Sequence, residues 1–185
     1  MRSWSNYGEQ ARLVRQAISQ EEIDSVILLI LETRASHKKI LICGNGGSSS
    51  TAEHFAADLG VGSQLRGTGY SAISLSSNSS VITALGNDKN FEEIFAIQVD
   101  LYGEEGDLLF VVSASGQSKN LVRAIEVAKE RSMKTVAFLG FDGGSILNIV
   151  DFALHAKTSL GEYGLVEDVH LSLSHYITER VRLGA

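Results

Sequence analysis

The sequence predicts an α/β protein, a three-layer doubly wound sandwich built on a five-stranded parallel sheet. Short apolar runs alternate with segments of helical periodicity along most of the chain, as in folds that place crossover helices on both faces of a sheet. The runs are rich in Ile, Val, Leu and Phe, which is typical of strands buried on both sides. Two of them lead into Gly/Ser-rich loops and then into helix patterns, an arrangement that binds ligands at the carboxyl ends of parallel strands.

Residues 6–35 predict one long amphipathic helix ahead of the first strand. Its apolar residues recur near 3.6 spacing and are Ala11, Val14, Ile18, Ile23, Val26, Ile27 and Ile30. The step from Ile18 to Ile23 breaks strict register. We expect this helix to pack on the sheet or on a partner chain.

Five strands alternate with helices after this segment. The expected strands are Lys39–Cys43, Ser71–Leu75, Asp107–Val112, Thr135–Leu139 and Phe152–His155. The expected helices lie near Ser49–Leu59, Ser79–Leu85, Phe91–Tyr102, Lys119–Arg131, Ser145–Ile149 and Val166–Arg182. Gly60–Gly69 is expected to be a loop and Gly140–Gly144 a turn, because glycines concentrate there. Right-handed crossovers between parallel strands then give the doubly wound sheet.

Length and charge are those of an ordinary globular domain. The chain has 185 residues, of which 44% are apolar and 21% charged. We expect a single domain, residues 1–185, with a helical extension over 1–35 and an α/β core over 36–185. The formal charge is −6 and no Lys/Arg-rich stripe appears, so no nucleic-acid partner is expected.

Cysteine usage and hydropathy bear on the compartment. Cys43 is the only cysteine, which excludes a disulfide framework and a thiolate metal cluster. The first residues are polar and charged rather than a signal sequence, and no apolar run reaches the ~18 residues of a membrane span. We therefore expect a cytoplasmic protein with no membrane partner.

The first Gly/Ser loop, Gly44–Ser50, follows the strand Lys39–Cys43 and opens a helix. Bare backbone N–H groups and hydroxyls at the positive end of a helix suit a phosphate. Glycines in such a loop also serve a tight turn, but the hydroxyls of Ser48, Ser49 and Ser50 exceed what a turn needs. The loop is neither G-x-G-x-x-G nor a Walker sequence, which weakens a dinucleotide interpretation.

The second loop, Ser113–Ser118, follows the strand Asp107–Val112 and has the same chemistry. One serine would be enough to cap the helix that follows. Three hydroxyls, on Ser113, Ser115 and Ser118, exceed that need and predict a phosphate cradle. Two loops of this kind in one small domain indicate an anionic ligand at the carboxyl edge of the sheet.

Imidazoles and carboxylates recur on two of the predicted helices. His54 and Asp58 are four residues apart and share a helix face. The last helix carries a second group, Glu167, Asp168, His170 and His175. A histidine hydrogen-bonded to a carboxylate, or a solvated helix face, would explain each group separately. Together they form a set able to bind a divalent metal such as zinc or to relay protons.

At these residues the chain resembles the sugar isomerase (SIS) domain family, and within it the phosphoheptose isomerase branch. The resemblance spans nearly the whole chain and rests on Cys43–Ser48 (CGNGGS), Ala52–Ala56 (AEHFA), Gly86–Asp88 (GND), Ser113–Ser118 (SASGQS) and Gly140–Gly144. It implies the SIS fold and the isomerisation of sedoheptulose 7-phosphate to a heptose 7-phosphate in bacterial heptose biosynthesis, through a metal-assisted enediol mechanism. It also implies a homotetramer with sites between subunits.

The resemblance implies roles for individual residues. It places phosphate and sugar contacts at Asn45, Gly46, Gly47, Ser48, Asp88, Ser113, Ala114, Ser115 and Ser118. It places one divalent metal per subunit, zinc by ligand type, on His54, Asp58, Glu167 and His175. It implies catalysis by Asp58 as base and His175 as acid, with Glu167 as a metal ligand or an alternative base.

Four positions depart from the family pattern. Asp58 stands where a glutamate is usual, Glu167 where a glutamine is usual, and Gly164 replaces an aspartate. The arginine that usually follows the first metal-site helix is missing from Gly60–Ser63. Losing a methylene draws the carboxylate back by about 1 Å, a displacement that can lower a rate by about 10²-fold unless the structure compensates.

A second class of function is an alternative, namely a non-catalytic SIS module. Some relatives of this kind sense phosphosugars, and one group binds a replication initiator protein as a tetramer. That group lacks the second histidine and the carboxylate, whereas His175 and Asp58 are present here. The residues therefore favour chemistry over binding alone.

Overall fold

Five parallel strands form one sheet in the computed structural model, which describes residues 3–65, 67 and 69–184. The strands are β1 (Lys39–Gly44), β2 (Ser71–Ser74), β3 (Leu108–Ser113), β4 (Lys134–Leu139) and β5 (Phe152–His155). Their order, β2-β1-β3-β4-β5, changes direction between β1 and β3, as in doubly wound folds. Every predicted strand is confirmed, with ends displaced by no more than one residue.

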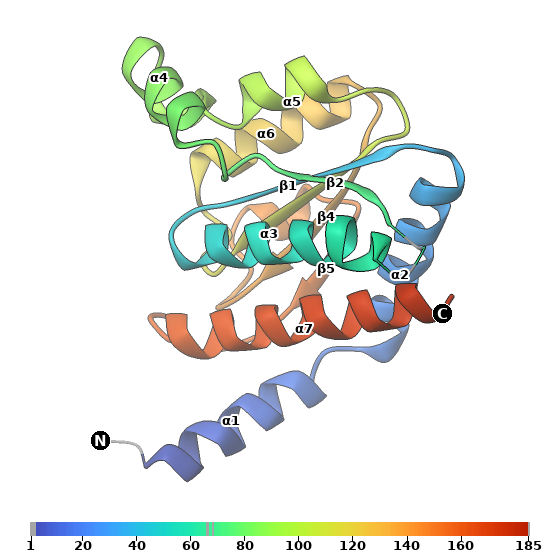
Figure 1. The fold of residues 1–185 in the computed structure, drawn as a ribbon. Helices are drawn as coiled ribbons and strands as arrows, with labels where there is room; N and C mark the ends of the chain where they lie inside the picture. The colour runs from blue at the N-terminus through green and yellow to red at the C-terminus, as the bar shows by residue number, and fades with distance from the viewer. Residues whose placement is uncertain (1–2, 66, 68, 185) are drawn as a thin grey trace.

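Helices cover both faces of this sheet (Figure 1). They are α1 (Trp4–Gln16), α2 (Gln20–Ala35), α3 (Gly47–Ala57), α4 (Ser79–Asp88), α5 (Ala96–Tyr102), α6 (Lys119–Glu130) and α7 (Tyr163–Leu183). One face packs against α2, α3 and α7, and the opposite face packs against α5 and α6. The α/β sandwich expected from the sequence is therefore confirmed. No helix within the described ranges is long and apolar enough to cross a membrane.

The core follows the alternation of side chains along the buried strands. In β1, Ile40 and Ile42 face the layer of α2, α3 and α7, whereas Leu41 faces the layer of α5 and α6. An aromatic cluster anchors α3 to the sheet, because the ring of Phe55 lies edge-on to that of Phe110 with centroids 5.3 Å apart. This packing holds α3 against the sheet, and α3 begins just after the carboxyl end of β1.

The single N-terminal helix expected over residues 6–35 is wrong, since α1 and α2 are separate. Ser19 caps α2 by accepting a hydrogen bond from the Glu22 backbone N–H, and the break coincides with the interrupted register after Ile18. Buried residues of α2 belong to the core, whereas α1 lies along α7. The Tyr7 hydroxyl donates to Asp168 Oδ2 at 2.7 Å, and burial together with this carboxylate raises the pKa of Tyr7 to about 12.

Three shorter predictions are also modified. The 91–102 segment is a 3-10 turn, Phe91–Glu93, followed by α5, and the expected helix at 145–149 is a 3-10 turn, Ile146–Asn148. The expected loop over 60–69 begins as a π-helix, Asp58–Gly62, that continues α3. Residues 66 and 68 of that loop lie outside the described residues.

His170 makes stability depend on pH. Its side chain is fully buried on α7 beside Phe138, and this burial lowers the pKa of His170 from 6.5 to about 4. Between these values the unfolded chain binds more protons, so the stabilisation is complete above about pH 6.5 and is lost as pH falls through 4. We expect His170 to lower the free energy of unfolding by roughly 3 kcal/mol over that range.

Urea unfolding at pH 7 and pH 4.5 measures this effect. The variant His170→Leu should unfold with a shallower pH dependence than the parent protein, because the group that titrates is gone. Equal pH dependence in the two proteins would contradict the assignment.

Candidate functional site

A pocket of about 320 Å³ lies at the carboxyl ends of β1 and β3. It is lined by Asn45, Gly46, Gly47, Ser48, Val112, Ser113, Ala114, Ser115, Ser118, Tyr163 and Glu167. The structure thus brings together eight of the nine residues expected to contact sugar and phosphate. Both Gly/Ser loops contribute because adjacent parallel strands end at the same edge of the sheet.

The second loop is shaped by its own serines. Ser113 Oγ accepts a hydrogen bond from the Gly116 N–H at 3.0 Å, and Ser115 Oγ accepts from the Gln117 N–H at 3.3 Å. Gly116 has a φ of 61°, and a Cβ there would collide with the carbonyl of Gly143. Ser118 is the N-cap of α6, yet in the described structure its hydroxyl makes no capping hydrogen bond, which leaves it available to a ligand.

The first loop is tied to the second by a pair of amides. Asn45 Nδ2 donates to Asn120 Oδ1 at 3.0 Å, and Asn120 Nδ2 donates to Asn45 Oδ1 at 2.9 Å. Sequence reasoning missed Asn120 and also Tyr163, which lines the pocket. In the sequence, Asn120 is marked only by its position as the second residue of the expected helix that follows the Ser113–Ser118 loop.

Glu167 places a carboxylate against the start of α3. A Cβ on Gly47 would collide with this carboxylate, so any larger residue at position 47 would displace the Glu167 side chain. A negative charge near a helix N-terminus is favourable, but the same charge lines a pocket suited to phosphate. We therefore expect the Glu167 carboxylate to oppose the binding of a dianion in this pocket.

We expect Glu167→Gln to tighten the binding of inorganic phosphate about fivefold to tenfold. Removing one like charge at this range changes the binding free energy by on the order of 1 kcal/mol at the effective dielectric of a protein surface. Titration calorimetry at pH 7 measures the change. Glu179→Gln, on an exposed turn further along α7, is the control and should bind phosphate as the parent does. Weaker binding by Glu167→Gln would show that the carboxylate assists the ligand.

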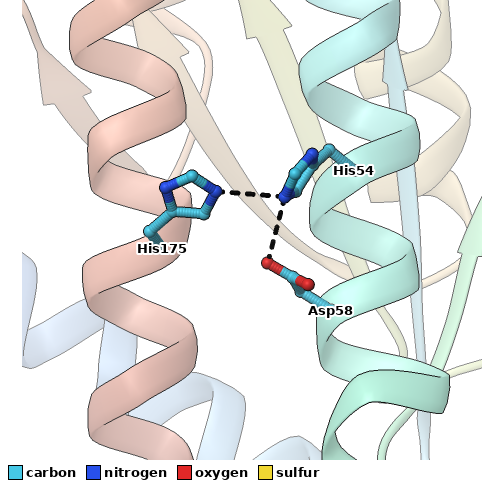
Figure 2. Close-up of side chains that lie close together, drawn as sticks. All are labelled: His54, Asp58 and His175. Carbon is cyan, nitrogen blue, oxygen red and sulfur yellow. Dashed lines mark hydrogen bonds and ion pairs between the residues drawn. The ribbon is translucent and has the colours of Figure 1, made fainter.

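Two imidazoles and a carboxylate meet where α3 and α7 pass each other (Figure 2). His54 Nε2 lies 3.3 Å from Asp58 Oδ2 and 3.0 Å from His175 Nε2. One ligand atom from each of these residues lies within 4.8 Å of the others. The His54 side chain is 48% exposed, so a ligand could approach from solvent.

The two separations from His54 Nε2, 3.3 Å and 3.0 Å, are close to those in a tetrahedral metal centre. With metal–ligand bonds of 2.0–2.1 Å, two ligand atoms of a tetrahedral ion lie ~3.4 Å apart. Three protein ligands also leave one coordination position for water or substrate, which is the composition of catalytic zinc sites. The donor set therefore fits a divalent metal on His54, Asp58 and His175.

Two expected site residues lie elsewhere. Glu167 is not part of the His54–Asp58–His175 group, because it precedes His175 by eight residues, a rise of ~12 Å along α7. Glu167 instead lines the pocket wall, and its role as a metal ligand or alternative base stays a prediction. Asp88 ends α4, which projects from the body of the subunit, and its carboxylate accepts a hydrogen bond from Asn87 rather than lining the pocket.

This doubly wound sheet, with two serine-glycine loops at its carboxyl edge, defines a phosphosugar-binding class of protein, and the chain belongs to the SIS domain family. The model of that family matches residues 6–140. Within the family, a curated relative named phosphoheptose isomerase, from Helicobacter pylori, is 41% identical over 160 residues, covering 86% of this chain and 82% of the relative.

Solved structures agree with this placement. A phosphoheptose isomerase from Neisseria gonorrhoeae superposes with a TM-score of 0.86 at 32% identity, covering 96% of this chain and 95% of that one. A phosphoheptose isomerase from Francisella tularensis gives a TM-score of 0.88 at 29% identity, covering 94% and 92%. The likeness extends over the whole fold, including the helices that carry the histidines.

Proposed function

We propose that this chain isomerises sedoheptulose 7-phosphate to an aldoheptose 7-phosphate. The observation that carries the proposal is the relation between the pocket and the histidine group. Both lie along the line where α3 meets α7, with Gly47 beside Glu167 at one end and His54 beside His175 at the other. The curated relatives and solved structures named phosphoheptose isomerase support the same reaction.

The spacing suits a seven-carbon substrate. Gly47 and His54 are seven residues apart on α3, a rise of ~10 Å. In an extended ketose 7-phosphate, single bonds of about 1.5 Å place the phosphorus roughly 9 Å from the second carbon. A phosphate held by the serine loops would thus bring the reacting carbons to Asp58 and His175.

The chemistry requires a proton to move between the first two carbons. The Asp58 carboxylate would take a proton from C1 of the open-chain ketose and return it to C2 of the enediol. Nε2 of His175 faces His54. The other ring nitrogen, Nδ1, would exchange the protons on O1 and O2 of the sugar. The serine loops orient the chain through its phosphate, which keeps C1 and C2 in register with the base.

A single divalent ion, which we propose to be Zn²⁺ from the ligand types, would be held by His54, Asp58 and His175. When bound, the ion would polarise the substrate carbonyl. The chain's own residues orient the sugar and move the protons. Asp58, rather than Glu167, is proposed as the base, because Glu167 lies at the phosphate end of the site.

Turnover of sedoheptulose 7-phosphate by purified protein tests the proposal, with fructose 6-phosphate as the matched shorter substrate. One carbon less displaces the reacting atoms by about 1 Å, so we expect kcat/KM to be about 10²-fold lower for the six-carbon sugar. Binding of both sugar phosphates without turnover would instead indicate a non-catalytic module.

We further propose a homotetramer held by the N-terminal helices. The side chains of Trp4, Leu13 and Leu28 on α1 and α2 are 87%, 51% and 57% exposed, which is apolar surface that helix packing between subunits would bury. Sedimentation at micromolar concentration should give a tetramer, and Leu13→Gln should shift it toward smaller species. A monomeric parent protein would contradict the proposal.

A cytoplasmic location is proposed on the chemistry of the described residues. Cys43 is a free buried thiol, and burial raises its pKa, so it is neither reactive nor paired. A protein without a disulfide suits a reducing compartment.

A further inference from the structure

The π-helical turn after α3 is held by an arginine from the other end of the chain. The Gly60–Ser63 segment contains no arginine of its own. Arg182, near the end of α7, reaches into this turn with a side chain that is only 19% exposed. A cation is therefore present beside Asp58, although it comes from a distant part of the sequence.

Arg182 contacts the turn at three points. Its Nη2 donates to the Asp58 carbonyl at 2.9 Å, and its Nε donates to Ser63 Oγ at 3.1 Å. Ser63 Oγ in turn donates to the same Asp58 carbonyl at 2.8 Å. The Nη2 atom also lies 4.0 Å from Asp58 Oδ1, the oxygen that does not face His54.

Gly62 makes room for this guanidinium. A Cβ at Gly62 would lie 2.6 Å from Arg182 Nη2 and 3.6 Å from Asp58 Oδ1. Its backbone is not in the left-handed region, so a Cβ at this position would act by displacing the guanidinium rather than by straining the backbone. Single π-turns within α-helices frequently mark functional sites, and here the turn begins at Asp58 itself.

We propose that Arg182 is a positioning residue for Asp58. A planar guanidinium offers two N–H groups in a fixed geometry, one to the Ser63 hydroxyl and one to the Asp58 carbonyl, whereas an ammonium on a flexible stem does not fix the two bonds in this way. The guanidinium of Arg182 therefore stabilises the π-turn and directs the Asp58 carboxylate toward His54 and His175. This role rests on the proposed metal site. It explains how Asp58, one methylene shorter than the glutamate usual at this position, can be directed toward His54 and His175.

Titration of the metal-stripped full-length protein with Co²⁺, followed by visible absorption, tests whether Arg182 positions Asp58. Arg182→Lys keeps the charge and loses the planar guanidinium, and Gly62→Ala keeps the arginine and displaces it. Both should weaken Co²⁺ binding about 10-fold, as is typical when an outer partner of a metal ligand is lost, and both should alter the ligand-field spectrum. Arg180→Lys is the control, since Arg180 contacts Tyr176 and Asp24 on the surface.

The outcomes separate the two proposals. Parent-like affinity and spectrum in Arg182→Lys and Gly62→Ala would overturn the role of Arg182 while leaving the metal site intact. Weaker Co²⁺ binding by both variants, together with no turnover of sedoheptulose 7-phosphate by the parent, would support the role of Arg182 and overturn the proposed reaction. A parent protein that binds no Co²⁺ would overturn the metal site and the role of Arg182 together. Thermal unfolding of each variant distinguishes these results from a loss of folded protein.

Discussion

His175→Gln is expected to abolish both metal binding and isomerisation while leaving the fold intact. The side chain is exposed, so the change removes no core packing. It removes the only imidazole that α7 brings to His54, at 3.0 Å, and the proposed proton donor to the sugar oxygens. Loss of a general acid alone lowers rates by 10²–10⁴-fold, and we expect a fall in kcat/KM of at least about 10³-fold.

Metal content by elemental analysis and turnover of sedoheptulose 7-phosphate are the two measurements. His37→Asn is the control, because it removes an exposed imidazole far along the chain, and asparagine suits the φ of 56° at that position. The control and the His175→Gln variant should both unfold cooperatively at similar temperatures. Full activity in His175→Gln would show that neither this histidine nor a metal has the role proposed here.

Replacing Ser113, Ser115 and Ser118 together by alanine is expected to remove phosphate binding. Each hydroxyl bonded to a charged oxygen is worth about 1.5 kcal/mol, so the triple change should weaken sugar-phosphate affinity on the order of 10³-fold. Ser118→Ala alone should account for about 10-fold, because its hydroxyl makes no capping bond within the described structure. The other two serines also hold the loop, so their loss adds a conformational component.

Phosphate affinity by calorimetry and the position of sulfate in crystals grown with that ion measure this prediction. The anion should lie within hydrogen-bonding distance of the three hydroxyls in the parent protein. Ser25→Ala is the control, since among the described residues the hydroxyl of this serine bonds within α2, to the Glu21 carbonyl at 2.8 Å. If the anion lies elsewhere and the triple variant keeps its affinity, the cradle is not at this loop.

Local patterns were enough to predict the sheet and both loops. The central strands β1, β3 and β4 are almost wholly buried apolar runs, whereas β2 and β5 are shorter and only partly buried. The serine and glycine loops are predictable because the carboxyl ends of parallel strands meet at one edge. His54 and Asp58 are predictable as a pair because four residues return a helix to the same face.

The break between α1 and α2 was only partly visible in the sequence. The irregular step after Ile18 is present in the apolar pattern, but periodicity alone did not locate the turn. In the structure the two helices separate just before Ser19, because its hydroxyl caps α2 and its extended backbone does not continue a helix. Periodicity measures the direction of side chains around a helix and is insensitive to a short interruption of its axis.

Tertiary structure alone decided which residues of α7 meet which residues of α3. The sequence by itself placed His54 and Asp58 on one helix face, whereas Glu167 and His175, eight residues apart, are offset by roughly 80° around their helix. It did not determine how far one helix slides along its neighbour, because that displacement is set by packing against Phe110 and Phe138 in the sheet. The observed displacement puts Glu167 at the phosphate pocket, His175 at His54 and Arg182 at Asp58.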